Sequence, residues 1–415
     1  MAVGGLEAAF REEWPRILGS VLRFTGDLQL AEDAVQEACA RLLARSASGA
    51  QEPANVASYL TTAAKHIAVD TLRRDAGFAR SFGKLAADAA DRQAAEAEAQ
   101  QLDPLAVSLD DDRLRLIVLA CHPELAEEAR LALALRVVCG VPTDEIADLF
   151  LVKRATMAAR LTRAKQRIQA SGIRLEAPDA RELAARLDDV LSVVYLLYTL
   201  GHTAPSGHEL SSAVVSASAL GLARETVRIA PRHLEARGLL ALILLTEARS
   251  PGRTAADGTV VGLEHADRSR WDRELIEEGI DQATVALAGR GRFALQAGIA
   301  GLHSEAPDWA ATDWVSIVSL YDALARIWPS PAVLLNRSIA RSHLPGALET
   351  ALAEIDALEP LAGGALARQR WAARGELLHR AGRHAESAAA YRTAIEAEPN
   401  RMVRAFLAES ARRGR

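Results

Sequence analysis

The sequence has few of the residues that mark secreted, metal-binding or membrane proteins. Its 415 residues include three cysteines, without the CxxC spacing of metal sites or redox motifs: Cys39, Cys121 and Cys139. We expect reduced thiols and a cytoplasmic protein. The N-terminus lacks a basic segment followed by an apolar run, so no signal peptide is expected. The longest apolar runs, near 190–200 and 238–245, are too short to cross a bilayer, and we expect no membrane partner.

Strand signals and catalytic motifs are also missing. Runs of β-branched residues are few, and glycine and proline are sparse within long stretches, which predicts an all-α fold. The sequence contains no glycine-rich phosphate loop, no HExxH and no nucleophile elbow. Its histidines are scattered, and adjacent carboxylates such as Asp110–Asp112 are typical of linkers and helix starts. We therefore expect neither enzymatic activity nor a metal or cofactor.

The most informative stretch is 141–168, which reads as two short helices with a tight break. Thr143 is expected to cap the first helix, and Asp144 and Glu145 favour its first turn. Apolar residues of the second helix recur at three- and four-residue spacing. Its outer side carries only positive charge, although the whole chain has a net charge of −5. These outer residues are Lys153, Arg154, Arg160, Arg163, Lys165 and Arg167.

A helix that is apolar on one side and cationic on the other suits the major groove of DNA. The alternative is an ordinary helical hairpin with a solvated basic face. Solvated faces usually mix charges of both signs, whereas 151–167 contains six basic residues and no acidic residue. We therefore favour DNA binding for this segment.

Three further helices are predicted before it, at 6–22, 27–45 and 58–80. The second has an apolar stripe that includes Leu30, Val35 and Leu43, with Asp33, Gln36, Glu37 and Arg41 on the other side. The third ends in a basic patch that contains Lys65, Arg73 and Arg74. Between this region and the helix pair, 88–112 holds eight acidic residues and one base, as in a flexible linker.

Two of these segments resemble parts of one family. The AEDAVQE helix, the polar loop and the helix ending in LRR resemble the second domain of extracytoplasmic-function (ECF) sigma factors. The helix pair resembles their fourth domain, through Glu145-Ile146-Ala147, Thr156, Arg160-Leu161 and Arg163-Ala164. Two matches in the expected order are far more specific than either match alone.

The resemblance implies core RNA polymerase and promoter DNA as partners. It places Asp33, Gln36, Glu37 and Arg41 against the clamp helices of the polymerase. It assigns promoter phosphates near the minus-ten element to Lys65, Arg73 and Arg74, and the 46–59 loop is our candidate pocket for an unstacked base. At the minus-thirty-five element, Arg154 and Thr156 are the better candidates for base edges. Phosphate contacts are expected from Arg160, Arg163, Lys165 and Arg167.

The predicted organisation has four parts. These are a sigma domain 2 at 1–85, an acidic linker at 86–109, a sigma domain 4 with the helix-turn-helix at 110–172, and a helical extension at 173–415. In the extension, residues from Trp371 to Pro399 follow the spacing of one tetratricopeptide repeat, and Tyr321 and Pro329 recur about two repeat lengths later. This predicts a tetratricopeptide-like stack of helical pairs.

The extension also resembles that of one sigma-factor subgroup. Its polar segment 256–279 supplies our regulatory candidates, Asp267, Arg268, Arg270, Trp271 and Asp272. A buried, ion-paired helix start is an equally good interpretation of these residues. We expect the extension to regulate or support activity, with an intramolecular contact to the sigma domains. The alternative function is a helix-turn-helix regulator with a tetratricopeptide-like sensor or protein-interaction domain that does not bind polymerase.

Overall fold

The computed structural model describes residues 13–48 except Pro15 and Arg23, 53, 55–74, 112–171 except Leu151, 180–202, 212–255, 258–358 and 364–413. These residues form helices and connecting turns, with one isolated antiparallel bridge between Thr254 and Val260. The predicted all-α fold is therefore confirmed. The expected linker at 86–109 lies outside the described residues. No described helix is both long and apolar enough to span a membrane.

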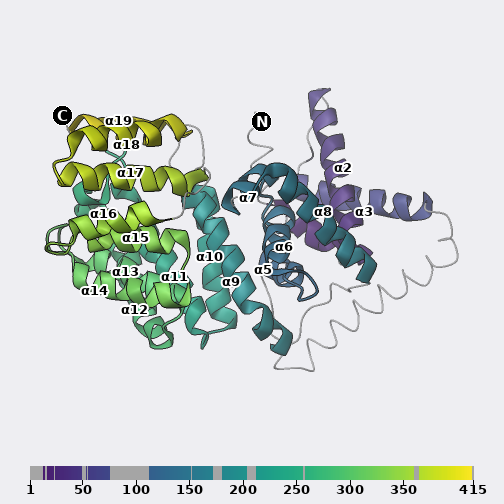
Figure 1. Ribbon diagram of the computed structural model, residues 1–415. Coiled ribbons are helices and arrows are strands. Elements are labelled where there is room, and N and C mark those ends of the chain that lie inside the picture. The colour runs from purple at the N-terminus through teal and green to yellow at the C-terminus, as the bar shows by residue number, and fades with distance from the viewer. Residues whose placement is uncertain are drawn as a thin grey trace. The chain divides into compact units, whose positions relative to one another are not determined.

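The chain divides into two compact units, Met1–Val193 and Val194–Arg415. Unit 1 begins with helical residues between 13 and 25, followed by α2 (Leu28–Ala47) and α3 (Val56–Arg74), shown in Figure 1. Asp27 caps α2, because its carboxylate accepts a hydrogen bond of 3.0 Å from the backbone N–H of Leu30. Val35 is fully buried as predicted, but Leu43 is half exposed and does not belong to the apolar stripe.

The second part of unit 1 contains α5 (Asp112–Ala120), α6 (Glu127–Leu133), a π-helical turn η2 (Ala134–Val138), α7 (Thr143–Leu149) and α8 (Arg154–Ser171). Gly140 separates η2 from α7 and has a φ of 69°, which favours glycine. The expected cap by Thr143 is wrong. Pro142 occupies the cap position without a side-chain bond, and Thr143 is the first residue of the helix. Helix α7 therefore begins at Thr143, one residue earlier than a cap at Thr143 would place its start.

Helix α9 (Ala180–His202) contributes to both units. In unit 1, the guanidinium of Arg130 forms an ion pair of 3.2 Å with Asp189, and both side chains are largely buried. In unit 2, the hydroxyl of Tyr198 donates a hydrogen bond of 2.8 Å to Glu247. The start of α9 therefore packs into unit 1, and its end belongs to the core of unit 2.

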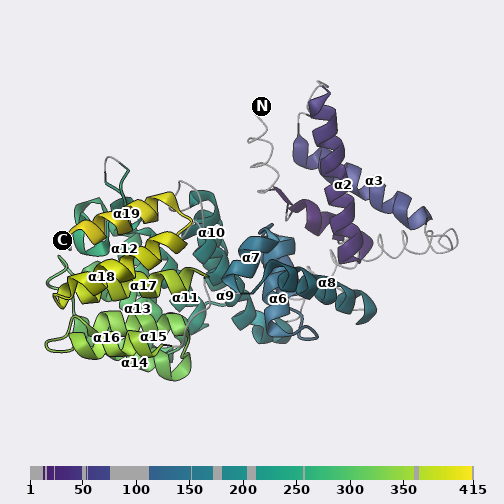
Figure 2. The same cartoon turned by 45° about the horizontal axis from the view of Figure 1, so that its top comes forward.

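Unit 2 is a series of helices in which consecutive members pack side by side (Figures 1 and 2). Short 3-10 turns interrupt the series at η3 (Ser250–Gly252), η4 (Leu263–His265), η5 (Arg268–Arg270) and η6 (Leu287–Gly289). The helices are α10 (Ala213–Ile229), α11 (Leu234–Glu247), α12 (Arg273–Ala286), α13 (Arg292–Glu305), α14 (Trp314–Ile327), α15 (Pro331–Arg341), α16 (Leu348–Ala357), α17 (Gly364–Arg380), α18 (His384–Ala397) and α19 (Arg401–Arg413).

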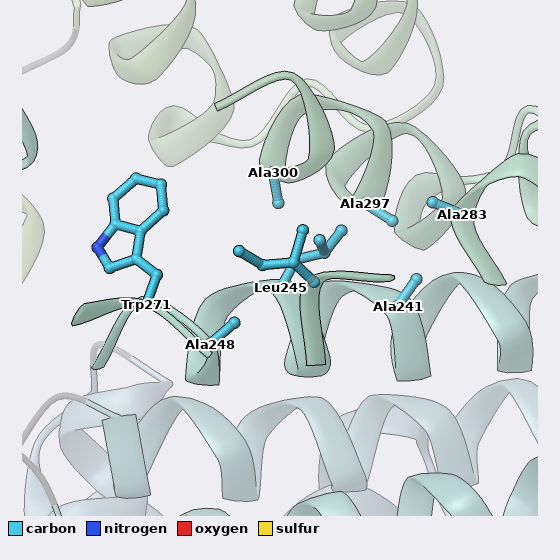
Figure 3. Close-up of a cluster of buried hydrophobic side chains, with 8 residues drawn as sticks. Ala241, Leu245, Ala248, Trp271, Ala283, Ala297 and Ala300 are labelled. Carbon is cyan, nitrogen blue, oxygen red and sulfur yellow. The ribbon is translucent and has the colours of Figure 1, made fainter. Parts of the chain in front are cut away.

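Small residues let the first helices of unit 2 approach closely. The core between α11, α12 and α13 consists mainly of alanines around Leu245, with the indole of Trp271 at one end (Figure 3). A Cβ on Gly279 of α12 would lie 2.7 Å from the Leu245 side chain. Glu235 then fixes the start of α13, because its carboxylate accepts hydrogen bonds of 2.9 and 3.0 Å from the backbone N–H groups of Phe293 and Ala294.

The segment in which one tetratricopeptide repeat is predicted forms the helix pair α17 and α18, and its tetratricopeptide-like nature stays a prediction. Gly375 lies against the ring of Tyr391, and a Cβ at this glycine would come within 2.9 Å of that ring. The hydroxyl of Ser387 donates a hydrogen bond of 2.8 Å to the carbonyl oxygen of Gly375. Gly382, with a φ of 73°, forms the turn between the helices. The residues of the repeat pattern thus hold two antiparallel helices together.

Candidate nucleic-acid interface

The residues that the sequence assigns to polymerase binding share one exposed face of α2. Asp33, Gln36, Glu37 and Arg41 are all exposed. Glu37 and Arg41 form an ion pair of 2.8 Å along the helix, and Asp33 accepts a hydrogen bond of 2.9 Å from Gln29. These contacts lie within the helix surface, so the face remains accessible to a partner.

The basic patch of α3 is only partly described. Lys65 is half-buried near the middle of this helix. Arg73 and Arg74 occupy its last turn, and their side chains lie outside the described residues. The candidate base pocket in the 46–59 loop also includes undescribed positions, namely 49–52 and 54.

Helix α8 has the two faces that its sequence pattern predicts. Met157, Leu161 and Ala164 are buried, with exposures of 0%, 6% and 4%. The same spacing places Arg154 and Thr156 on the exposed first turn, with Lys153 just before it. Because the entry end of a recognition helix meets base edges in a major groove, this arrangement is suited to DNA reading.

Three of the six basic residues already have carboxylate partners within unit 1. The ion pairs are Arg160–Glu128 at 2.7 Å, Arg167–Glu124 at 3.0 Å and Lys165–Glu32 at 2.6 Å. These three cations are therefore less available for phosphate contacts than the sequence pattern indicates. Among the described residues, no carboxylate pairs with Lys153, Arg154 or Arg163. The unneutralised positive charge is thus concentrated on the entry end and middle of α8.

The partner of Lys165 is a residue that sequence reasoning missed. Glu32 is 3% exposed and lies on α2, which also supplies Gln36 as a hydrogen-bond donor to it at 3.2 Å. The helical period could have found it, because Glu32 falls beside Ala31 and Val35 on the inner side of α2. The pairing with Lys165 joins residues 133 positions apart, and local periodicity carries no information about such contacts.

The regulatory candidates in unit 2 mostly stabilise the polypeptide. Asp267 accepts hydrogen bonds from Ser269, and Asp272 caps α12 by accepting one of 3.1 Å from the N–H of Leu275. Arg270 donates to the carbonyl oxygen of Thr254 at 2.6 Å.

The remaining two candidates, Arg268 and Trp271, stack with 4.7 Å between the guanidinium carbon and the ring centroid. Among the described residues, Arg268 does not form the ion pair of the alternative interpretation, and its guanidinium donates hydrogen bonds to carbonyl oxygens instead.

Comparison with known families assigns the three segments separately. Residues 9–78 match sigma-70 region 2, and residues 115–168 match sigma-70 region 4. Residues 186–287 match a family of unknown function, DUF6596. The first two matches include α2, α3, α7 and all but the last three residues of α8, and the third contains the segment with Arg268 and Trp271.

Regions 2 and 4 in this order, on helices with the faces described above, define a sigma-70 family factor of the ECF-like type, a protein that directs transcription initiation. These regions imply core RNA polymerase and promoter DNA as partners. The chain is 37% identical over 407 residues to an uncharacterized protein of Rhizobium meliloti (strain 1021), covering 97% of this chain and 94% of that protein. It belongs to the same family as that protein.

Proposed function

We propose that the exposed face of α2 binds core RNA polymerase while the exposed face of α8 binds the minus-thirty-five element of the promoter. The observation that carries this assignment is the pair of separate outward faces, one with carboxylates and one with unpaired cations. The polymerase-binding residues of this proposal are Asp33, Gln36, Glu37 and Arg41. Lys65, Arg73 and Arg74 would hold backbone phosphates near the minus-ten element.

Within α8, the structure supports a division between base reading and phosphate binding. Arg154 and Thr156 lie on the first turn, where side chains reach base edges. Lys153 and Arg163 are exposed and carry charges suited to phosphates. Arg163 also donates a hydrogen bond of 3.2 Å to the carbonyl oxygen of Ala159, which orders its guanidinium.

The paired cations of α8 would exchange a carboxylate for a phosphate on binding. Arg167 and Glu124 are both well exposed, and exposed ion pairs contribute only about 0–1 kcal/mol, so this exchange costs little. Lys165 differs, because releasing it leaves the carboxylate of Glu32 buried without its cation. We therefore rank Arg163 and Arg154 above Arg160 and Lys165 as DNA contacts.

For the C-terminal unit we propose a regulatory or supporting role in initiation. A series of stacked helices makes an extended surface for a partner, and an intramolecular contact with the sigma regions is the simplest form of such regulation. The boundary between the two units falls within α9, so the sigma regions and the C-terminal unit belong to one continuous polypeptide.

Salt-dependent DNA binding tests the role of α8. In the variant Arg163→Ala, the slope of log affinity against log salt concentration should fall by about 0.9, because one phosphate contact releases about that number of counterions. The loss of affinity should be similar on all sequences. Fluorescence anisotropy with labelled duplexes measures both quantities. Arg181→Ala, at an exposed arginine of α9, is the matched control and should keep the wild-type slope. A changed base preference with an unchanged slope would contradict the phosphate assignment.

A further inference from the structure

Unit 2 contains a cluster of two arginines and a histidine where α11 and α13 end. Arg249 follows α11, Arg268 lies in η5, and His303 lies in the last turn of α13. One amino group of Arg268 (Nη1) donates hydrogen bonds of 2.8 and 2.5 Å to the carbonyl oxygens of His303 and Ala306. Its guanidinium also stacks on the ring of Trp271. Arg268 is therefore fixed between the end of α13 and an indole.

Several donors in this cluster have no acceptor. The Nη2 atom of Arg268 and the Nδ1 atom of His303 are both buried and without a hydrogen-bond partner in the part of the chain that the structure describes. The guanidinium of Arg249 likewise makes no hydrogen bond or ion pair with any residue that the structure describes. Its side chain is partly accessible to solvent. Unsatisfied buried donors and charges are costly, so their convergence indicates a site rather than a packing accident.

Positive charge predominates in the cluster, although the carboxylate of Asp308 lies close enough to Arg268 to raise its pKa against the effect of burial. Burial, together with the charges of Arg268 and Arg253, lowers the pKa of Arg249 to about 10. Burial and the charges of Arg249 and Arg268 lower the pKa of His303 to about 3, so this imidazole is neutral near pH 7. The nearby carboxylate of Glu247 is engaged by the hydroxyl of Tyr198. Among the residues that the structure describes, Arg249 itself has no carboxylate partner.

We propose that Arg249, Arg268 and His303 form an anion-binding site that takes the carboxylate or phosphate group of a small molecule. A guanidinium presents a planar fork that matches the oxygens of either group. A neutral imidazole supplies one further N–H donor. The indole of Trp271, whose nitrogen faces away from Leu245 in Figure 3, provides a flat apolar wall beside these donors. The site lies within the C-terminal unit and does not depend on the function proposed for the sigma regions.

Thermal unfolding of the full chain tests this site. Sodium phosphate and sodium benzoate are titrated at constant ionic strength against sodium chloride. At least one of them should raise the melting temperature in a saturable manner, by roughly 5–10 °C at a hundredfold excess over its dissociation constant. A response to benzoate alone would assign a carboxylate ligand, and a response to phosphate alone would assign a phosphate. Absence of a saturable rise with both anions would overturn the proposal.

Substitution of Arg249 distinguishes a binding role from a structural role, because the two roles predict changes of opposite sign in the melting temperature. Arg249→Met should abolish the anion response and raise the melting temperature in chloride, because it removes an uncompensated charge. The matched control Arg273→Met, at an exposed arginine of α12, should keep the response. A lower melting temperature or a failure of Arg249→Met to fold would show that the guanidinium is structural and would count against the site. Arg249→Lys, which keeps the charge but not the fork, should fold and bind at least about tenfold more weakly; unchanged binding would contradict the role of the fork.

Discussion

At the residue scale, two histidines of unit 2 are held in their neutral form. Burial, aided by Arg249, Arg268 and His343, lowers the pKa of His303 to about 3. Burial and the charge of Arg380 lower the pKa of His343 to about 4. The ring of His343 stacks on Trp314 at 3.9 Å between centroids, and Trp309 packs against both histidines. These residues form one aromatic cluster that cannot easily accept a proton.

This cluster predicts a loss of stability at mildly acidic pH. Below about pH 6.5 the unfolded histidines bind protons whereas the folded ones do not, so the free energy of unfolding falls as the pH falls. Each histidine contributes at most about 1.4 kcal/mol per pH unit between pH 6.5 and 5. Urea unfolding followed by tryptophan fluorescence at pH 7 and pH 5 measures the slope. His303→Gln should reduce it, whereas the exposed control His265→Gln should not; equal slopes in all three proteins would contradict the argument.

The residues of the candidate interface were predictable only where one helix decides their position. The helical period places Arg154 and Glu37 outward from sequence alone, and the structure agrees. Long-range partners could not be predicted in this way. Nothing in the local pattern indicates that Lys165 meets Glu32 or that Arg268 meets the end of α13. The buried donors of unit 2 that lack an acceptor could not be predicted from sequence either, because the absence of a hydrogen-bond partner depends on the tertiary structure.

At the scale of single elements, the fold depends on close helix contacts made through glycine and alanine. A Cβ on Gly238 of α11 would lie 2.6 Å from the backbone nitrogen of Ala294 on α13. Backbone atoms cannot move aside as a flexible side chain can. Helix positions were predictable from apolar periodicity, but this close approach was not, because a glycine within a helix pattern does not specify its neighbour.

Two glycines with different surroundings provide a matched test. Gly238→Ala should lower the free energy of unfolding by about 1–3 kcal/mol or more, because the two helices must separate. Gly221→Ala in α10 should raise it by about 0.5–1 kcal/mol, since this glycine is exposed and a Cβ added to it would meet no other atom within 4 Å. Chemical denaturation of both variants measures the difference. A similar effect of both substitutions would contradict the close packing of α11 on α13.

For the complete chain, the all-helical class and the order of the sigma regions followed from sequence, whereas the predicted domain limits stay predictions. Sigma domain 4 is predicted to end at residue 172, and the compact unit that contains it continues to Val193. Arg186 shows why, because it is buried and donates a hydrogen bond to the carbonyl oxygen of Val118. A truncation designed to remove the C-terminal unit should therefore keep residues through Val193.

Transcription reconstituted from purified core RNA polymerase, the full chain and a library of promoter fragments tests whether this protein directs initiation. We expect transcripts that start at defined promoters, and a yield that changes when the chain ends after Val193. Glu37→Arg should lose these transcripts while keeping its affinity for DNA, because it reverses a charge on the polymerase-binding face. The absence of promoter-dependent transcripts from the full chain, with a core enzyme that is active with another sigma factor, would contradict a role in transcription initiation.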